Sequence, residues 1–415
     1  MKARMQGAAS LLITCLLLLL ILVLTLSSYQ RLFFQIKRVQ NEVETLQQFW
    51  LAESALECAF SIISAQGRAP EDLQQQCLNL GIESEELQLL PAYPHTLSVT
   101  MNSGRTISKR LRLFNDRSAG VIQARSNLLV NGNLSFTPDA REQNAGGDWL
   151  CKLVSYQANL SLNGQLTNAN LDAMRPPYDD FPNAQTCAAT HLTQNVLLAD
   201  VSNDGVDDLF MQRFDVPRSD WKSLMYGGKF YQIPQGLPDV DSALPPSAMI
   251  ENCGAKIVAA IEDGHDLIWL YGSCELKQSA LDVTEIEAAI TANSNVQGVL
   301  LVVHDGIFAT NGEQGLSALI YQIVTEGSTF VPSELLWSST ESHQLTPVPL
   351  GMTLSQLSYY QSGGFYAKGG YVLDAPHLTA LFSADINGAF SGGLLDGALK
   401  KIRETRWQIG SWRDY

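Results

Sequence analysis

The N-terminal sixty residues decide the fold. Residues 8–30 read AASLLITCLLLLLILVLTLSSYQ, and from Ala8 to Gln66 the chain contains neither glycine nor proline. An apolar helix of about 20 residues is long enough to cross the hydrocarbon core of a membrane. We therefore expect residues 8–30 to form a transmembrane helix.

The same helix is expected to continue outside the membrane. Two apolar series recur at spacings of three and four residues, which is the period of an α-helix. They are Ile36, Val39, Val43, Leu46 and Trp50, and then Phe49, Leu56, Phe60 and Ile63. At a rise of 1.5 Å per residue, residues 8–66 would form a rod roughly 90 Å long.

A short basic leader precedes the apolar run. Its charges are Lys2 and Arg4, it ends at Gly7, and the next charged residue is Arg31. The positive-inside tendency places the leader in the cytoplasm and the rest of the chain across the inner membrane. A secretory signal peptide has a shorter apolar stretch and a small-residue cleavage site, and it needs no helical continuation.

The leader, the apolar helix and its amphipathic extension together resemble the N-terminus of a type IV pilin. The strings QGAASLLITCLLLLL (residues 6–20) and LAESALECAF (residues 51–60) are most similar to the PilX-type minor pilins, as is the ending GSWRDY (residues 410–415). The resemblance implies cleavage by prepilin peptidase between Gly7 and Ala8 and methylation of Ala8. It also implies that the N-terminal helix packs against other minor and major pilins.

Leu12 departs from the pilin pattern. In major pilins the fifth mature residue is a glutamate, held to pair with the N-terminus of the neighbouring subunit. A leucine there favours an accessory or tip-located subunit, which has no neighbour above it to recruit. The large K-type pseudopilin of type II secretion shares this omission and stays a competing resemblance. A plain signal anchor with a helical stalk is the simpler alternative.

Length and composition are those of a multidomain globular protein beyond the membrane helix. We expect two to three domains and an α+β fold, with a large β-rich head that includes a partial β-solenoid as one alternative. The predicted segments are the leader 1–7, the helix halves 8–30 and 31–66, a helix-packed β-hairpin region 67–120, and β-rich regions 121–250 and 251–415. The net charge of −15 and pI near 4.8 disfavour nonspecific nucleic-acid binding.

The cysteines predict three disulfides. Cys15 lies in the apolar helix, and six cysteines follow it in a compartment where thiols oxidise. Six cysteines allow fifteen pairings, of which we favour nearest neighbours in sequence. The predicted pairs are Cys58–Cys77, Cys151–Cys187 and Cys253–Cys274. Buried free thiols are the alternative, and the sequence holds no C-x-x-C motif for redox or zinc chemistry.

β-Structure is predicted after the rod ends at Gly67. A short polar helix is expected over residues 71–80. The strings TLSVTM (residues 96–101) and ISKRLRLF (residues 107–114) alternate with period two around a turn at 102–104, which predicts a β-hairpin.

A weak internal repeat follows. NLLVNGNLS (residues 127–135) and NLSLNGQLT (residues 159–167) match at an offset of 32 residues, each with an Asn-Gly turn. Two copies allow paired hairpins or successive coils of a β-solenoid. Further on, DLIWLYG (residues 266–272), GVLLVVHDG (residues 298–306) and ALIYQIV (residues 318–324) predict a buried β array.

The most specific local motif is a candidate calcium loop. Residues 170–250 are rich in proline and aspartate and are predicted to form long loops between short strands, where binding usually resides. Within them, ADVSNDGVDDLF places oxygen ligands at alternate positions around Gly205, the spacing used by calcium loops. The ligands would be Asp200, Ser202, Asp204, the Val206 carbonyl and Asp208. The simpler interpretation is an Asn-Asp-Gly turn with solvated acids.

Motifs for catalysis are lacking in the sequence. The histidines are scattered, and neither H-E-x-x-H, G-x-S-x-G nor a P-loop occurs. We therefore predict that the chain is not an enzyme. Glu53, a carboxylate in an apolar run, is expected to pair within the head or with a partner pilin, unless it lies on a solvated helix face. Trp407 and Trp412 are expected to anchor the core.

These observations favour one function and leave two alternatives. The favoured function is a PilX-type minor pilin that is inserted in the inner membrane and processed at Gly7. It would promote pilus assembly at or near the tip and present an adhesive head to a cell or surface. A membrane-anchored adhesin or binding module that never enters a filament is the first alternative. An anchored periplasmic enzyme is the second.

Overall fold

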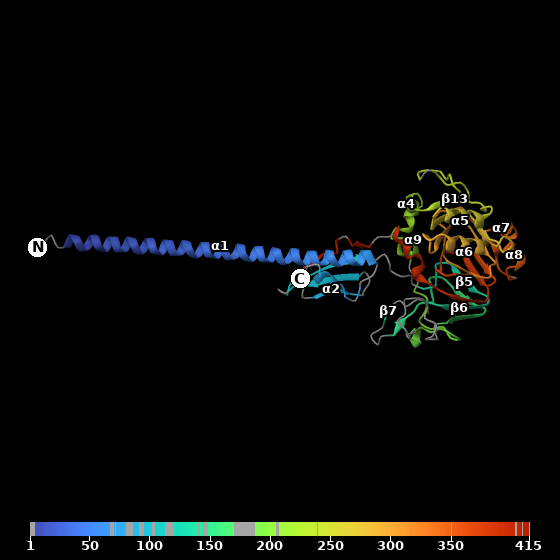
Figure 1. The fold of residues 1–415 in the computed structure, drawn as a ribbon, viewed down its shortest axis with the longest axis horizontal. Helices are drawn as coiled ribbons and strands as arrows, with labels where there is room; N and C mark the ends of the chain where they lie inside the picture. The colour runs from blue at the N-terminus through green and yellow to red at the C-terminus, as the bar shows by residue number, and fades with distance from the viewer. Residues whose placement is uncertain are drawn as a thin grey trace. The chain divides into compact units, whose positions relative to one another are not determined.

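The computed structural model divides the chain into two compact units (Figure 1). Unit 1 comprises Met1–Phe114 and Thr405–Tyr415, and unit 2 comprises Asn115–Glu404. Unit 2 is thus inserted into the sequence of unit 1. The residues that the structure describes are 5–66, 70, 72–79, 86–90, 95–101, 104–112, 120–138, 142–143, 148–169, 187–204, 207–238, 240–349, 351–402, 405–408 and 410–414.

One helix, α1 (Met5–Gln66), forms the N-terminal part of unit 1 (Figure 1). It runs for 62 residues and confirms the unbroken helix expected from Ala8 to Gln66. Its apolar N-terminal half is exposed from Leu11 to Leu26, and the helix is long and apolar enough to cross a membrane.

An antiparallel sheet packs on the C-terminal third of α1. Its strands β1 (Glu86–Leu90), β2 (His95–Thr100) and β3 (Thr106–Arg112) pair in sequence order, which confirms the predicted hairpin. The predicted polar helix is α2 (Leu73–Asn79). The turn residues 102 and 103 lie outside the described residues.

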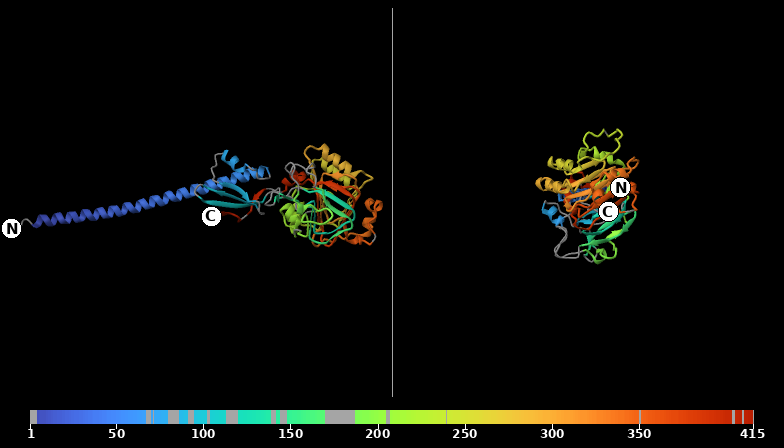
Figure 2. Two further views of the ribbon diagram at one scale, coloured as in Figure 1. Left: turned by 90° about the horizontal axis from the view of Figure 1, so that it is seen from below. Right: turned by 90° about the vertical axis from the view of Figure 1, so that its right-hand side faces the viewer.

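The chain returns to this sheet at its C-terminus. Strands β25 (Arg406–Trp407) and β26 (Arg413–Asp414) both pair antiparallel with β3, and Figure 2 shows the C-terminus beside these strands. The core of unit 1 forms where a face of α1 rich in small residues packs against the inward face of the sheet. Its buried members include Ala52, Ala55, Leu56, Ala59 and Ile63 from α1, and Leu97, Val99, Ile107 and Leu111 from the sheet.

Unit 2 is built on three parallel sheets. In spatial order, the first holds β12 (Val201–Ser202), β9 (Val154–Tyr156), β4 (Ile122–Ala124), β22 (Tyr371–Asp374), β19 (Ala318–Ile323), β16 (Val299–His304), β14 (Leu267–Tyr271) and β13 (Tyr231–Ile233). The second holds β10 (Leu160–Leu162), β5 (Asn127–Val130), β23 (Thr379–Ser383), β20 (Leu357–Ser362), β17 (Phe308–Thr310) and β15 (Cys274–Leu276). The third holds β11 (Gln165–Asn168), β6 (Asn133–Thr137) and β24 (Ile386–Ala389).

Two further strand pairs complete the β-structure of the described part. Strands β18 (Gly315–Leu316) and β21 (Tyr366–Ala367) are parallel, and β7 (Glu142–Gln143) and β8 (Trp149–Leu150) are antiparallel.

The chain crosses unit 2 in passes, each pass being a run of consecutive strands that lie in successive sheets. The two sequence repeats lie on neighbouring passes of the chain. Leu160 pairs with Leu128, and Gln165 pairs with Asn133, both in parallel and both at an offset of 32 residues. The two copies therefore do not form two hairpins. In each copy the chain runs through all three sheets in turn, as β4, β5 and β6 or as β9, β10 and β11, and the Asn-Gly turn carries it from the second sheet to the third.

The first pass of unit 2 lies inside the sheets and not at their end. Strand β4 pairs with β9 of the second pass on one side and with β22 of the last pass on the other. The last pass of the chain therefore pairs directly with the first pass. This long-range pairing joins the predicted regions 121–250 and 251–415, so the boundary expected at residue 250 does not separate two compact units.

Buried strands and aromatic rings fill the interior of unit 2. The predicted array corresponds to β14, β16 and β19, and all of their residues are buried. Phe308 pairs with Tyr359, and Phe382 lies two residues beyond the partner of Tyr359 on the next strand; the ring centroids are 5.5 Å and 5.2 Å apart. Such contacts between passes hold the register of the parallel sheets.

Helices cover the outside of the sheets, with α5 and α6 side by side (Figure 1). The α-helices are α3 (Leu209–Phe214), α4 (Trp221–Met225), α5 (Cys253–Glu262), α6 (Asp282–Ala292), α7 (Glu334–Ser338), α8 (Glu341–Leu345) and α9 (Asp396–Lys400). The short 3-10 turns are η2 (Ala189–His191), η3 (Arg218–Asp220), η4 (Leu354–Gln356) and η5 (Gly392–Leu395).

The predicted long loops of residues 170–250 are in part helical. Helix α3 forms because Leu209, Phe210 and Phe214 bury one apolar face against Trp269 and Tyr321 of the first sheet. The proline and aspartate residues of this region predicted loops, but the apolar face of residues 209–214 makes a helix there. Residues 170–186 lie outside the described residues.

Candidate functional site

The predicted processing and assembly positions lie at the start of α1. Gly7 and Ala8 fall within the helix, and Leu12 is 65% exposed. A leucine at this position presents an apolar side chain to the surroundings, where a glutamate would present a charge that is costly to bury in lipid. This part of α1 is therefore suited to lipid or to a second apolar helix.

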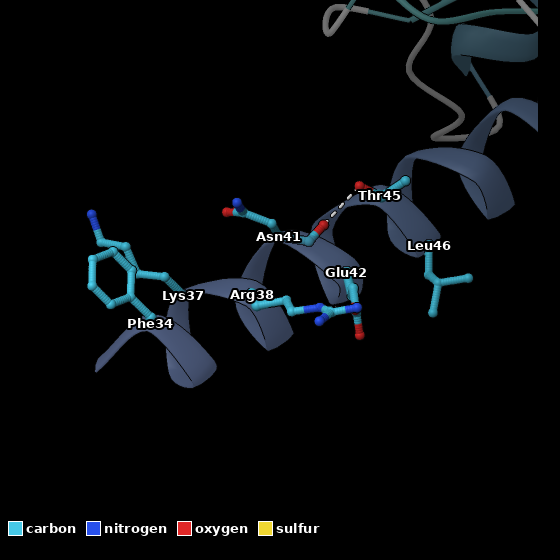
Figure 3. A pocket seen from close by; sticks show the side chains of 7 residues that line it. All are labelled: Phe34, Lys37, Arg38, Asn41, Glu42, Thr45 and Leu46. Carbon is cyan, nitrogen blue, oxygen red and sulfur yellow. Dashed lines mark hydrogen bonds and ion pairs between the residues drawn. The ribbon is translucent and has the colours of Figure 1, made fainter. Parts of the chain in front are cut away.

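The amphipathic half of α1 offers a mixed surface, shown in Figure 3. Arg38 Nε lies 3.0 Å from Glu42 Oε1, and Thr45 Oγ1 donates to the Asn41 carbonyl at 2.7 Å. The side chains in this view are Phe34, Lys37, Arg38, Asn41, Glu42, Thr45 and Leu46, and all come from the one helix. Exposed apolar and charged groups alternate here, which suits contact with another helix better than an enclosed ligand.

Glu53 is paired within unit 1. Lys109 Nζ on β3 donates to Glu53 Oε1 and lies 3.3 Å from Glu57 Oε1. The Lys109 side chain is 13% exposed and that of Glu53 is 23% exposed. Glu53 Oε2 is buried and accepts no hydrogen bond from the described residues. Of the alternatives left open by the sequence, the carboxylate takes the contact within the head.

Trp407 holds the C-terminal segment against the same part of α1. Its indole Nε1 donates to Glu57 Oε1 at 3.1 Å, and its ring stacks on Phe60 with centroids 4.7 Å apart. Lys109 Nζ lies 5.0 Å from the centre of the indole ring. Trp407 therefore packs against the core as predicted. Trp412 is 44% exposed and touches Phe49 only at its edge.

All three predicted disulfides are present. Cys58–Cys77 joins α1 to α2, Cys151–Cys187 closes the chain around residues 170–186, and Cys253–Cys274 ties α5 to β15. Cys15 is free and exposed on the apolar half of α1. The three bridges fit an oxidising compartment for the two units.

The proposed calcium ligands take separate roles in the structure. Asp200 is fully buried and accepts from Thr193 N at 3.0 Å and from Asn168 Nδ2 at 3.1 Å. Asp208 caps α3 by accepting from Met211 N at 2.7 Å, and it also accepts from Arg218 N at 3.0 Å. Each carboxylate is satisfied by neutral donors that stabilise the backbone around it.

Lys152 supplies the cation at the other two side chains. Its Nζ donates to Ser202 Oγ and lies 2.7 Å from Asp204 Oδ2. Burial alone would raise the pKa of Asp204, but hydrogen bonds from Lys152 and Ser202 and the charge of Lys152 lower it. Gly205 and Val206 lie outside the described residues. As placed, the described side chains do not converge on one ion, so calcium at this loop stays an untested prediction.

A buried charge cluster was not foreseen from the sequence. Asp374, at the end of β22, accepts from Arg218 and from Arg125 NH1 at 3.1 Å, and Tyr321 OH lies 3.2 Å away. Burial raises the pKa of Asp374, and the two arginines oppose that change. Arg218 also donates to the Val324 carbonyl. This cluster fixes the η3 turn to the ends of two strands.

Comparison with protein-family models, curated proteins and solved structures gives no match. The functional assignment therefore depends on the residues and geometry of this chain.

Titratable groups are spread through the described residues without a metal-binding cluster of three or more. His304 is fully buried among Trp221, Trp269 and Tyr271, and burial lowers its pKa to about 4. Asp263, His265 and Asp266 lie at a turn through Gly264 before β14, and Lys401 Nζ contacts Asp266 Oδ2 at 2.6 Å.

Lys109 was not foreseen from the sequence, although β3 carries a signal for it. Ile107, Lys109 and Leu111 alternate along β3 and share the face that packs on α1. A lysine in a buried series needs a carboxylate partner. The acids of LAESALECAF, Glu53 and Glu57, were the available candidates.

Proposed function

We propose that the chain is an accessory type IV pilin of the PilX type that promotes pilus assembly and presents a large head. The observation that carries the proposal is α1. It is exposed and apolar over its first half, and a small antiparallel sheet covers its end. A helix of this kind can remain in the inner membrane and later pack beside equivalent helices in a filament.

The exposed leucines of α1 support this use of the helix. Large apolar side chains from Leu11 to Leu26 are each at least half exposed, which is stable only in lipid or against other apolar surfaces. The core of unit 1 covers α1 from Phe49 onward, and the apolar half of the helix lies outside it. The same helix therefore supplies both a membrane anchor and an assembly surface.

Leu12 supports a place at or near the pilus tip. A glutamate at this position would seek the N-terminal amine of a neighbour within the apolar filament core, and Leu12 cannot make that pair. A subunit without the acid would join the filament less readily along the shaft. It could still cap the assembly, in contact with other minor pilins below it.

Unit 2 is proposed to be the presented head and to have a β-solenoid architecture. The support is that the first two passes of the chain contribute strands to all three parallel sheets at an offset of 32 residues, and later passes extend the first two sheets. The unit is anchored at both ends, since the chain enters it after β3 and leaves it before β25. Such a double connection suits a large domain that must stay attached to a small one.

Leader removal is the first test. The full-length gene carrying Gly7→Phe is expressed in its own host, and the mature N-terminus is read by mass spectrometry in the membrane fraction and in sheared filaments. We expect wild-type protein to begin at Ala8 in both fractions and the variant to keep its leader and stay out of filaments. Ala3→Phe, a bulky change elsewhere in the leader, should be processed normally. A Gly7→Phe chain that matures and enters filaments would overturn the proposal.

Deletion of the gene separates the proposed pilin from the alternative. Loss of an assembly factor should lower the number of pili counted by electron microscopy. A membrane-anchored adhesin outside the filament would leave pilus number unchanged while attachment falls.

A further inference from the structure

An acidic cavity of about 440 Å³ opens beside the first turns of α5 and α6. Its lining includes Glu251, Asn252, Glu275, Lys277, Asp282 and Glu285. Four of these six are carboxylates and one is a lysine, so the cavity favours a cation. Two of the carboxylates have a structural role, because Asp282 and Glu285 lie in the first turn of α6, where negative charge stabilises the helix dipole.

Glu275 lies on strand β15, so stabilisation of a helix N-terminus does not account for its carboxylate. The residue is only 4% exposed, and its Oε1 accepts from Ser342 N at 2.7 Å and from Ser342 Oγ at 2.9 Å. Its Oε2 takes part in none of the hydrogen bonds among the described residues, although the side chain lines the cavity. A carboxylate oxygen that a largely buried side chain presents to a cavity is stabilised by a hydrogen-bond donor, and a cationic donor bonds most strongly.

An apolar groove of about 400 Å³ continues from the cavity. Ser339 lines both hollows, and the chain from Pro246 to Cys253 runs along both. The groove includes Phe330, Val331, Leu335 and Leu336. Val331 is 67% exposed and Leu335 is 83% exposed, so two large apolar side chains stand in solvent beside an acidic cavity.

Charge complementarity identifies the occupant. Residues 251–341 carry 13 acidic and 2 basic side chains, so the sequence around the cavity and groove is far more acidic than the chain as a whole. An acidic field attracts basic partners and repels acidic ones. The exposed leucine and valine add an apolar anchor point of the kind found at the centre of peptide-binding grooves.

We propose that the cavity and groove together are a docking surface for a basic peptide segment of another protein. An arginine or lysine side chain of that segment enters the cavity and donates to Glu275 Oε2, and a nearby apolar side chain packs on Val331 and Leu335. This surface lies entirely in unit 2. The inference therefore stands whether or not the chain enters a filament.

The test uses the full chain in zwitterionic lipid nanodiscs, with empty nanodiscs as the blank. The probe is a fluorescein-labelled octapeptide of alternating leucine and arginine, and binding is followed by fluorescence anisotropy at physiological salt. Two matched octapeptides replace leucine by serine or arginine by glutamate. We expect each replacement to weaken binding by about tenfold or more.

Three variants and two controls locate the binding. Glu275→Gln keeps the Oε1 acceptor for Ser342 and removes the charge. Glu285→Gln removes a charge from an exposed side chain at the rim of the cavity. Leu335→Ser removes the apolar anchor. Each is expected to weaken binding severalfold. The controls are Glu262→Gln at the other end of α5 and Val196→Ser, an exposed apolar residue outside both hollows.

Three results would overturn the docking surface. Equal binding of the serine peptide would reduce the effect to general charge attraction. Equal binding of the glutamate peptide would reduce it to apolar contact. Loss of affinity in Glu262→Gln or Val196→Ser equal to that in Glu285→Gln and Leu335→Ser would place the binding elsewhere.

Discussion

The indole ring of Trp407 stacks on the phenyl ring of Phe60, with centroids 4.7 Å apart and planes 23° apart. The whole of unit 2 lies between the two residues in sequence, yet both belong to unit 1, where Phe60 is half-buried on α1 and Trp407 packs against the core. This contact closes the small sheet over α1 after the chain has completed unit 2. Unit 1 is therefore complete only when its C-terminal segment is in place.

Replacing Trp407 by alanine should destabilise unit 1. Trp407 is half-buried, so its removal should cost about 2 kcal/mol, which includes the loss of a donor to Glu57. Urea unfolding of the full chain in detergent, followed by tryptophan-independent far-UV circular dichroism, measures the loss. Trp412→Ala is the matched control. Because Trp412 is 44% exposed, its loss should cost less than about 1 kcal/mol.

The Lys109–Glu53 pair gives a second prediction. Lys109→Met removes the charge partner of a largely buried carboxylate and should cost about 2 kcal/mol of unfolding free energy, because Glu53 is then left without its cation. The double variant Lys109→Met, Glu53→Gln should recover part of that loss. A double-mutant cycle by urea unfolding measures the coupling. Independent, additive effects of the two changes would contradict the pairing.

Much of unit 1 could be predicted from sequence because its signals are local. The absence of glycine and proline over 59 residues specifies α1, and period-two alternation specifies the β2–β3 hairpin. The three disulfides join cysteines 19 to 36 residues apart, so pairing by nearest neighbour succeeded. The return of the C-terminus to β3 carries no comparable local signal.

The order of strands in unit 2 could not be predicted for a related reason. Only two copies of the 32-residue repeat resemble each other, and the pairing of β4 with β22 joins residues about 250 positions apart. Parallel strands buried on both faces are apolar throughout, so their sequence does not say which neighbour they choose. The contacts of the predicted calcium loop could not be predicted for the same reason. Lys152 and Asp204 meet across two passes, which the loop sequence alone does not reveal.

The Asn-Gly turns of the repeat predict a third result. A Cβ at Gly132 would lie 2.3 Å from the Ala384 carbonyl oxygen, and Gly132 has φ +150°. Gly132→Ala should therefore force neighbouring passes apart and cost at least about 2 kcal/mol. Gly397→Ala is the control, since a Cβ there meets nothing within 4 Å and a helical glycine is replaced by a better helix former. Thermal unfolding of both variants should separate them clearly. A Gly132→Ala chain as stable as the control would show that the passes are not in close contact at this turn.

His304 predicts an acid-dependent loss of stability. Its pKa is about 4 in the folded chain, because burial opposes the charged imidazolium, against 6.5 in the unfolded chain. Between these values the unfolded chain binds the extra proton, so the contribution of His304 is fully present above about pH 6.5 and is lost as the pH falls toward 4. The full difference is about 3 kcal/mol. The variant His304→Gln keeps an acceptor for Trp269 Nε1, which donates to His304 Nδ1 at 3.2 Å.

Stability of wild type and His304→Gln should therefore be compared by urea unfolding from pH 7 to pH 4. Acidic side chains contribute to the pH dependence of both chains, so the difference between them isolates the histidine. We expect that difference to shift by about 3 kcal/mol in favour of the variant as the pH falls. His265→Gln, at an exposed histidine in the turn before β14, controls for the exchange of a histidine for a glutamine. Parallel curves for wild type and His304→Gln would mean that His304 does not stay neutral in the folded chain, and its aromatic enclosure would then have to open at acidic pH.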